Sequence, residues 1–431
     1  MKAMKKTDGE GWKETVIGTD AAKLAVMKAV AEEKDIRVAV DRPSHIYRLD
    51  EDAPFTLTGS GRVKAQFSMD GAKVLDEKIV TLKTGVPQTI KFRPTEPCFV
   101  RCKVFSDAKT PKFLSEVAAA FEPENIRPVL DEPSDFDTFW AGVLANLKTI
   151  PPDFQVQHLE KLSTNDFAIY SVSAANFDNT RIYGFYAAPK KMKIFPLLVG
   201  VPGGGPGSIA SRFAASADFW YKKAGTAYFE FRVHKYAPAE TVEEDMANHE
   251  IYKKSVGDSF YYAERCDDIK KSFLHRAISG GLRLVNWALS QPGVDKKHVV
   301  CFGASQGGDF GIFLSGLQAG FTAAWCGVPG VGDIGACMTG RRPCSVGIKE
   351  YITYNDQFRY YDGVNFAKRI RIPVLMTINF LDNACPPSGA YPMFQSLRGK
   401  KILLTEPTSG HSGSDEYVPF IENWAIWQLH K

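Results

Sequence analysis

The stretch HVVCFGASQG at residues 298–307 decides the fold, because an apolar run leads directly into a G-x-S-x-G motif. A helical run follows at residues 310–317. The motif thus stands between a strand and a helix, the setting of a nucleophile exposed on a sharp turn. Glycines flank the serine because the strained turn leaves no room for side chains. We predict that Ser305 is a catalytic nucleophile; the alternative is a glycine-rich packing turn.

Apolar runs and helical patterns alternate on both sides of this stretch. Residues 278–289 have an amphipathic helical pattern, and residues 208–223 a less regular one. The strand-like apolar runs lie at residues 197–201, 227–231, 298–302, 373–378 and 401–404. This alternation predicts a mainly parallel sheet with helices on both faces, and the serine motif within it predicts an α/β-hydrolase fold. Reactive groups should gather where the strands end.

The base should be a histidine that follows the serine along the chain, because this fold places the nucleophile first, the acid second and the histidine last. Only His411 and His430 come after Ser305. His430 is the penultimate residue, where chain ends fray. His411 lies in the small-residue loop SGHSG, at residues 409–413. We predict that His411 is the base; the alternative is a histidine that only packs or caps in its loop.

The acid is selected from seven carboxylates between the serine and the histidine. Asp382 directly follows the longest apolar strand, at residues 373–381, where a carboxylate can accept a hydrogen bond from the imidazole. Asp309 is too near the serine on the same helix. Glu406 is five residues from the histidine and is the second choice. We predict that Asp382 is the acid; the alternative is a loop cap or a surface charge.

Acyl transfer also requires donors for the oxygen of the tetrahedral intermediate. One should be the backbone N–H of Gln306, the residue after the nucleophile. The other should come from the loop PGGGPG at residues 202–207, where glycine lets the main chain approach a substrate. Gly204 is the first choice and Gly203 the second. The loop lacks the Lys-Ser/Thr that would complete a phosphate-binding loop.

Chain length, net charge and cysteine spacing limit the classes of partner and cofactor that we expect. The 431 residues predict two or three domains. A formal net charge of +4 gives no reason to expect nucleic acid or an anionic membrane as a partner. The eight cysteines show no zinc-ligand spacing, so we expect no metal site. The basic start MKAMKK leads into polar residues, so we expect no signal peptide in this chain, and no stretch is apolar enough for a membrane span. The compartment stays open.

The first part of the chain has a different pattern. Residues 21–33 predict an amphipathic helix. Residues 36–122 predict five to seven short strands separated by turns, which favours a small β-sandwich. We expect an accessory domain at residues 1–127 and a catalytic domain at residues 128–431. The aromatic residues of the accessory domain fit core positions at least as well as a sugar-binding platform.

The later part resembles the acetyl xylan esterase and cephalosporin-C deacetylase family, carbohydrate esterase family seven. The resemblance runs from residue 135 to the C-terminus, and its most specific segments are GASQGG at 303–308 and LDNACPPS at 381–388. The second segment selects Asp382 independently. Further matching segments are DFDTFWAG at 135–142, IYG at 182–184 and YDGVN at 361–365.

This resemblance implies removal of acetyl groups from acetylated oligo- or polysaccharides by a serine carboxylesterase. It also implies that no metal or organic cofactor is used and that the protein forms a homo-oligomer. Two segments depart from the family pattern. PGG at 202–204 replaces the family's His-Gly-Tyr, and of the family's Arg-Gly-Gln only Arg232 is present. Both departures bear on the shape of the acyl pocket and on substrate choice.

Two other functions compete with the esterase. A serine peptidase of the prolyl-oligopeptidase type shares the fold and the triad order, but such enzymes carry a far larger propeller domain. A non-catalytic carbohydrate-binding protein would be the second alternative. The complete set of Ser305, Asp382 and His411 argues against it.

Overall fold

The computed structural model describes residues 36–257, 261–265, 267–343, 356–413 and 415–431. The helix expected at residues 21–33 lies outside the described residues. Within them, no helix combines the length and the apolar character needed to cross a membrane.

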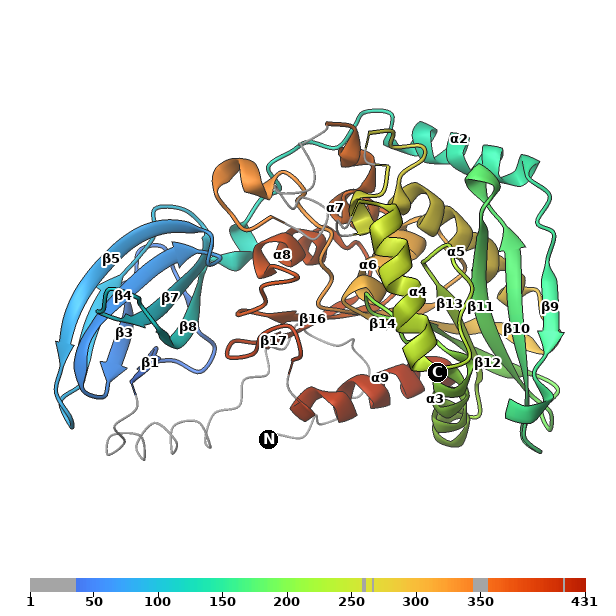
Figure 1. Ribbon diagram of the computed structural model, residues 1–431, viewed down its shortest axis with the longest axis horizontal. Helices are drawn as coiled ribbons and strands as arrows, with labels where there is room; N and C mark the ends of the chain where they lie inside the picture. Colours follow the sequence, from blue (N-terminus) through green and yellow to red (C-terminus); the bar gives the residue numbers. More distant parts are fainter. Residues whose placement is uncertain (1–35, 258–260, 266, 344–355, 414) are drawn as a thin grey trace.

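The C-terminal part of the chain is built on one large sheet (Figure 1). In the part of the chain that the structure describes, nine strands form this sheet in the order β17-β16-β15-β14-β12-β13-β11-β10-β9. The pairs from β17 to β13 are parallel, and those from β13 to β9 are antiparallel. The strands are β9 (Gln155–His158), β10 (Phe167–Ala175), β11 (Arg181–Pro189), β12 (Phe195–Val201), β13 (Ala227–Arg232), β14 (Val294–Ala304), β15 (Ala323–Gly327), β16 (Val374–Asn379) and β17 (Lys401–Glu406).

Helices cover both faces of this sheet, as the sequence predicted (Figure 1). On β12, Leu197 and Val199 pack into a core with α5 and α6, whereas Leu198 packs with α3 and α9 on the other face. Strands buried on both faces read as continuous apolar runs, which explains why the sequence revealed them. The helices are α2 (Phe136–Thr149), α3 (Ala210–Ala224), α4 (Val242–Ser255), α5 (Phe273–Leu289), α6 (Gln306–Gly316), α7 (Gly363–Ala367), α8 (Pro387–Ser396) and α9 (Val418–His430).

Four strands of the large sheet, β9, β10, β11 and β15, were not among the predicted strands, and the start of one helix differs from the expectation. Strand β15 has the sequence AAWCG, whose small residues have low strand propensity, and it was not among the predicted strands. Helix α2 begins at Phe136 as expected after Asp135, but the Asp135 side chain makes no capping bond. Its carboxylate instead accepts a hydrogen bond from the Tyr360 hydroxyl at 2.5 Å.

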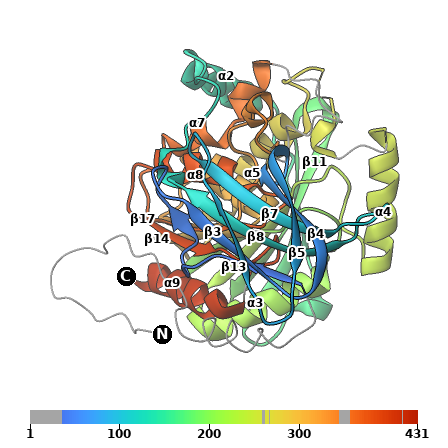
Figure 2. The ribbon, with the colours of Figure 1, turned by 90° about the vertical axis from the view of Figure 1, so that its left-hand side faces the viewer.

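The N-terminal part forms two smaller sheets that pack face to face (Figure 2). Phe55 and Leu57 of one sheet share a core with Phe67 and Val100 of the other, so the unit is a β-sandwich, with eight strands among the described residues. The first sheet contains β1 (Arg37–Ala39), β3 (Ala53–Thr58) and β6 (Gln88–Phe92). The second contains β2 (Ile46–Tyr47), β4 (Gly61–Met69), β5 (Lys73–Leu82), β7 (Cys98–Ser106) and β8 (Phe113–Phe121).

Three aromatic residues named from the sequence lie in the core of the sandwich. Tyr47, Phe55 and Phe67 are buried, and Phe92 stacks on Phe67 with ring centroids 4.6 Å apart. Tyr47, Phe55 and Phe67 thus occupy core positions, and Phe92 is half-buried against them.

The sandwich also contacts the large sheet directly. Phe99 of β7 packs against Phe380, just beyond β16, and against Tyr391 of α8, with ring centroids 5.0 and 5.4 Å apart. Phe99 therefore belongs to the hydrophobic core that is built around the large sheet. The domain boundary at residues 127 and 128 stays a prediction.

Candidate active site

Ser305 lies at the turn between β14, which ends at Ala304, and α6, which begins at Gln306. Its backbone has φ 59° and ψ −125°, a conformation that residues with a side chain rarely adopt. The Ser305 N–H donates to the carbonyl of Gly327 on the neighbouring strand at 2.8 Å, which holds the strained turn in place. Strain of this kind concentrates at functional sites.

The flanking glycines are required by space. A Cβ atom at Gly307 would lie 2.1 Å from the Val201 carbonyl oxygen, at the end of β12. A Cβ at Gly303 would lie 2.6 Å from the Gly307 carbonyl oxygen. Real Cβ atoms do not approach so closely, so the helix start can pack on the strand ends only because both positions are glycine.

Three side chains distant in sequence meet beside this turn. His411, in the loop after β17, places Nε2 3.0 Å from the Ser305 Oγ and Nδ1 2.8 Å from the Asp382 Oδ2. Asp382 is fully buried, whereas 39% of the His411 side chain is exposed. One edge of the imidazole is thus fixed by a buried carboxylate, and the other faces the hydroxyl on the solvent side.

The Asp382 carboxylate is held by its own loop. Its Oδ1 accepts hydrogen bonds from the backbone N–H groups of Ala384 and Cys385, both at 2.8 Å. The other oxygen, Oδ2, is the one that contacts His411. The two oxygens therefore have separate partners, and rotation of the carboxylate would break bonds on both sides.

The electrostatics favour a histidine that readily accepts a proton. The hydrogen bond that His411 donates to Asp382 raises the pKa of His411 above its ordinary value of 6.5, against the effect of desolvation, and the charges of Asp382 and Asp309 add to the rise. Burial raises the pKa of Asp309 to about 7, although the N–H groups of Val331 and Gly330 donate to it.

The other residues considered from the sequence lie elsewhere. The Asp309 carboxylate faces the N–H groups of a neighbouring loop, while the imidazole is bonded to Asp382. Glu406 lies at the end of β17 and accepts from the Ser409 hydroxyl at 3.4 Å. His430, at the end of α9, lies 2.9 Å from the Ala224 carbonyl oxygen at the end of α3.

The glycine loop at residues 202–207 lies against the start of α6. The side-chain amide of Gln306 donates to the Gly203 carbonyl at 3.3 Å, and its carbonyl oxygen accepts from the Tyr261 hydroxyl at 2.5 Å. A Cβ at Gly204 would lie 2.8 Å from that same hydroxyl, so Tyr261 occupies space that a side chain at position 204 would need. Gly204 itself is exposed.

A buried ion pair anchors the far end of this loop. The Gly207 N–H donates to the Asp245 carboxylate at 2.7 Å, and both Asp245 oxygens accept from the Arg232 guanidinium, at 2.6 and 2.7 Å. Burial alone would raise the pKa of Asp245, but the bonds from Arg232 and Gly207 hold it below its ordinary value. Arg232, the one residue kept from the family's Arg-Gly-Gln, thus supports the glycine loop.

Sequence reasoning did not find Tyr261 or Asp245. Tyr261 lies in a short 3-10 turn, η5 (Tyr261–Ala263), and Asp245 lies in α4, on elements separate from those of the residues they contact. Neither position carries a motif, so no sequence signal pointed to them.

The described residues contain one group of side chains close enough to share a metal ion. It consists of Asp382, Cys385 and His411, whose candidate ligand atoms lie within 4.8 Å of one another. Two of the three are already joined by the short hydrogen bond of the site. An ion there would replace the proton between them and disrupt the arrangement described above.

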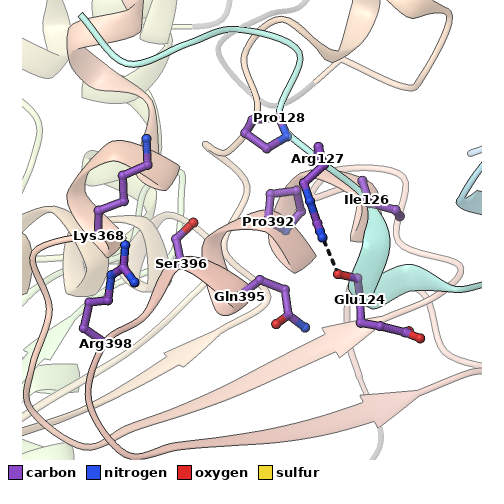
Figure 3. A pocket seen from close by; sticks show the side chains of 9 residues that line it. All are labelled: Glu124, Ile126, Arg127, Pro128, Lys368, Pro392, Gln395, Ser396 and Arg398. Atoms are coloured by element: carbon purple, nitrogen blue, oxygen red, sulfur yellow. Dashed lines mark hydrogen bonds between the residues drawn. The ribbon is translucent and has the colours of Figure 1, made fainter. Parts of the chain in front are cut away.

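A cavity of about 340 Å³ lies elsewhere, between the segment that leaves the sandwich and the region of α8 (Figure 3). None of Ser305, Asp382 and His411 borders it, so it is separate from the candidate site. It is lined by Glu124, Ile126, Arg127, Pro128, Lys368, Pro392, Gln395, Ser396 and Arg398.

Comparison with known proteins identifies the family. The model of the acetyl xylan esterase family, AXE1, matches residues 122–427. The chain is 28% identical over 342 residues to acetyl esterase Axe7A of Xylanibacter ruminicola, covering 78% of this chain and 76% of that protein.

Two solved structures share the fold. Acetyl xylan esterase 1 from Thermoanaerobacterium sp. superposes with a TM-score of 0.61 at 18% identity, covering 72% of this chain and 98% of that one. An acetyl xylan esterase from Paenibacillus sp. R4 gives a TM-score of 0.58 at 21% identity, with coverage of 70% and 98%. These likenesses confirm the predicted α/β-hydrolase fold, and the family match confirms the resemblance seen in the sequence. The protein belongs to the acetyl xylan esterase (AXE1) family.

Proposed function

We propose that this protein is a serine esterase that removes acetyl groups from acetylated carbohydrates through an acetyl-enzyme on Ser305. The observation that carries the proposal is the position of His411, with one nitrogen 3.0 Å from the Ser305 hydroxyl and the other 2.8 Å from the buried Asp382 carboxylate. Membership of the acetyl xylan esterase family supports acetyl esters as the substrate class.

The reaction follows from this geometry. His411 Nε2 takes the Ser305 proton as Oγ attacks the ester carbonyl, and Asp382 stabilises the imidazolium. The tetrahedral intermediate expels the sugar hydroxyl, which receives the proton from His411. Water then attacks the acetyl-enzyme with His411 again as base, which releases acetate and restores the serine.

The oxyanion would be held by the backbone N–H groups of Gln306 and Gly204. Gln306 is the first residue of α6, where unpaired N–H groups and the helix dipole favour negative charge. What supports Gly204 is the position of its loop, which the Gln306 side chain ties to the nucleophile turn. Gly203 is the second choice.

We also propose that the chain divides into an accessory unit at residues 1–127 and a catalytic unit at residues 128–431. Two findings support this division. The strands up to β8 form sheets separate from the nine-stranded sheet, and the family match begins at residue 122.

The substrate proposal is tested by acetate release. We expect hydrolysis of acetylated xylo-oligosaccharides and of simpler acetylated sugars, and no cleavage of a peptide with an internal proline. Acetate from the sugars and peptide fragments from the peptide would be measured with the same enzyme preparation. Cleavage of the peptide without acetate release would overturn the proposal in favour of a peptidase.

The pH dependence provides a second test. His411 must be neutral to accept the serine proton, so kcat/KM should fall as the pH drops through a pKa above 6.5. Asp309→Asn removes the weaker of the two charges that raise this pKa, a charge present mainly above the Asp309 pKa of about 7, and keeps an oxygen for the N–H groups of Gly330 and Val331. We expect this variant to move the acid limb of the profile to lower pH. A kcat/KM that stays constant as the pH falls far below 6.5 would contradict the assigned base.

A further inference from the structure

The side chain of Arg101 reaches from the β-sandwich into the loop that carries Asp382. Its Nη2 donates to the Asp382 carbonyl oxygen at 2.6 Å, and Nη1 donates to the Asn383 side-chain oxygen at 2.7 Å. Nη1 also lies 3.4 Å from the Leu381 carbonyl oxygen. One guanidinium thus contacts three consecutive residues of a loop that is 280 or more positions away in sequence.

The sandwich fixes Arg101 firmly. Arg101 lies in the middle of β7, paired with Ser68 of β4 on one side and Ala118 of β8 on the other, and its side chain is fully buried. Glu116 lies 3.7 Å from the guanidinium. Phe99, two residues earlier on the same face of the strand, packs on Phe380 at the start of the same loop.

The chemistry of arginine suits this task. A guanidinium offers five donors in a fixed plane, so bonds to several acceptors fix their relative positions as well as the distance to each. Here the acceptors belong to the backbone and side chains that surround the Asp382 carboxylate. Small displacements of a catalytic group lower the rate steeply, because the reacting atoms must be held close to their productive geometry.

We propose that Arg101 is a positioning residue, which fixes the backbone of residues 381–383 and thereby the Asp382 carboxylate that orients His411. The β-sandwich then helps to build the active site instead of only standing beside it. This inference rests on the proposed function, because it assigns Asp382 the role of the acid.

The test is the variant Arg101→Lys. Lysine keeps a positive charge near Glu116 but cannot donate to the three acceptors with the planar geometry of arginine. We expect kcat to fall about 10- to 100-fold with KM changed by less than about twofold, because orientation of the base is lost while the acyl pocket is kept. The acid limb of the pH profile should also move to lower pH, because a displaced Asp382 carboxylate would raise the pKa of His411 less. The contribution of Asp309 to that pKa would stay.

A matched control lies two residues along the same strand. Lys103 projects from the same face of β7 and lies 3.8 Å from the same Glu116. Lys103→Gln should therefore leave kcat and the pH profile as in the wild-type enzyme. A merely structural role for Arg101 would lower the melting temperature of Arg101→Lys without moving kcat or the acid limb below that temperature.

Asn383→Ala tests the same contact from the other side. Asn383 is exposed, so its truncation should leave the fold intact while removing the bond from Arg101 Nη1. We expect a smaller fall in kcat, with KM again unchanged, and this variant decides the matter if Arg101→Lys does not fold.

The inference would be overturned, and the proposed function kept, by one set of results. In it, Asn383→Ala and a folded Arg101→Lys have the wild-type kcat and pH profile, while Ser305→Ala is inactive. Retained activity in Ser305→Ala would overturn the proposed function instead.

Discussion

Replacing Ser305 by alanine is expected to lower kcat for 4-nitrophenyl acetate by about 10⁴- to 10⁶-fold, because no other group can form the acetyl-enzyme. The substitution removes the oxygen that lies 3.0 Å from His411 and leaves the strained turn, its glycines and the bond to Gly327 in place. The measurement is the initial rate of 4-nitrophenol release at saturating substrate, corrected for spontaneous hydrolysis.

A matched control is available next to the base. Ser412 is an exposed serine that follows His411 directly. Ser412→Ala should keep kcat within about twofold of wild type, which would separate loss of the nucleophile from general disturbance of the loop. Turnover by Ser305→Ala at the wild-type rate would place the nucleophile elsewhere.

The second large effect is expected for Asp382→Asn. Because Ala384 and Cys385 both donate to Oδ1, the amide oxygen of an asparagine must take that place, and its NH₂ group must face His411 Nδ1. The imidazole would then accept at Nδ1 and carry its proton on Nε2, where it cannot take the serine proton. We expect kcat to fall by about 10⁴-fold, the size seen when a triad aspartate is replaced in this way.

The control for this variant is Asp415→Asn. Asp415 is an exposed carboxylate in the same loop region, four residues after His411. Its replacement changes the net charge by the same amount but should leave kcat close to wild type. If Asp382→Asn kept kcat within about tenfold, the orienting role assigned to Asp382 would be wrong.

The meeting of the three side chains was predictable because residues that follow parallel strands gather at one edge of the sheet. Ser305 follows directly after its apolar strand, and Asp382 and His411 lie shortly beyond theirs. The carboxyl ends of adjacent parallel strands meet at one edge of the sheet. Position along the chain relative to each strand was therefore enough to predict that the three side chains meet, and the structure brings them within hydrogen-bonding distance.

The supporting contacts could not be predicted in this way. Arg101, Tyr261 and Asp245 act through side-chain hydrogen bonds to segments that are not adjacent in sequence, and such bonds leave no periodicity or spacing to detect. Arg101 in particular stands between apolar residues along β7, a pattern that predicts a strand but not the partners of the side chain. Its burial arises from the packing of the sandwich on the large sheet, which no local pattern encodes.

Strand β15 was missed for a different reason. Its short run of alanine, tryptophan, cysteine and glycine has little intrinsic preference for a strand, and it is stabilised by pairing with β14 and β16 on its two sides. The strand nevertheless matters for the site, since the carbonyl of its last residue, Gly327, accepts a hydrogen bond from the N–H of Ser305.

The most direct test of the central claim is to locate the nucleophile chemically. The wild-type enzyme would be treated with a 4-nitrophenyl organophosphonate, which forms a stable bond with an activated serine, and digested for peptide mapping by mass spectrometry. The account predicts one phosphonylated peptide that contains Ser305, loss of esterase activity in step with labelling, and much slower labelling of Asp382→Asn. A label on another residue, or full inactivation with an unmodified Ser305, would contradict it.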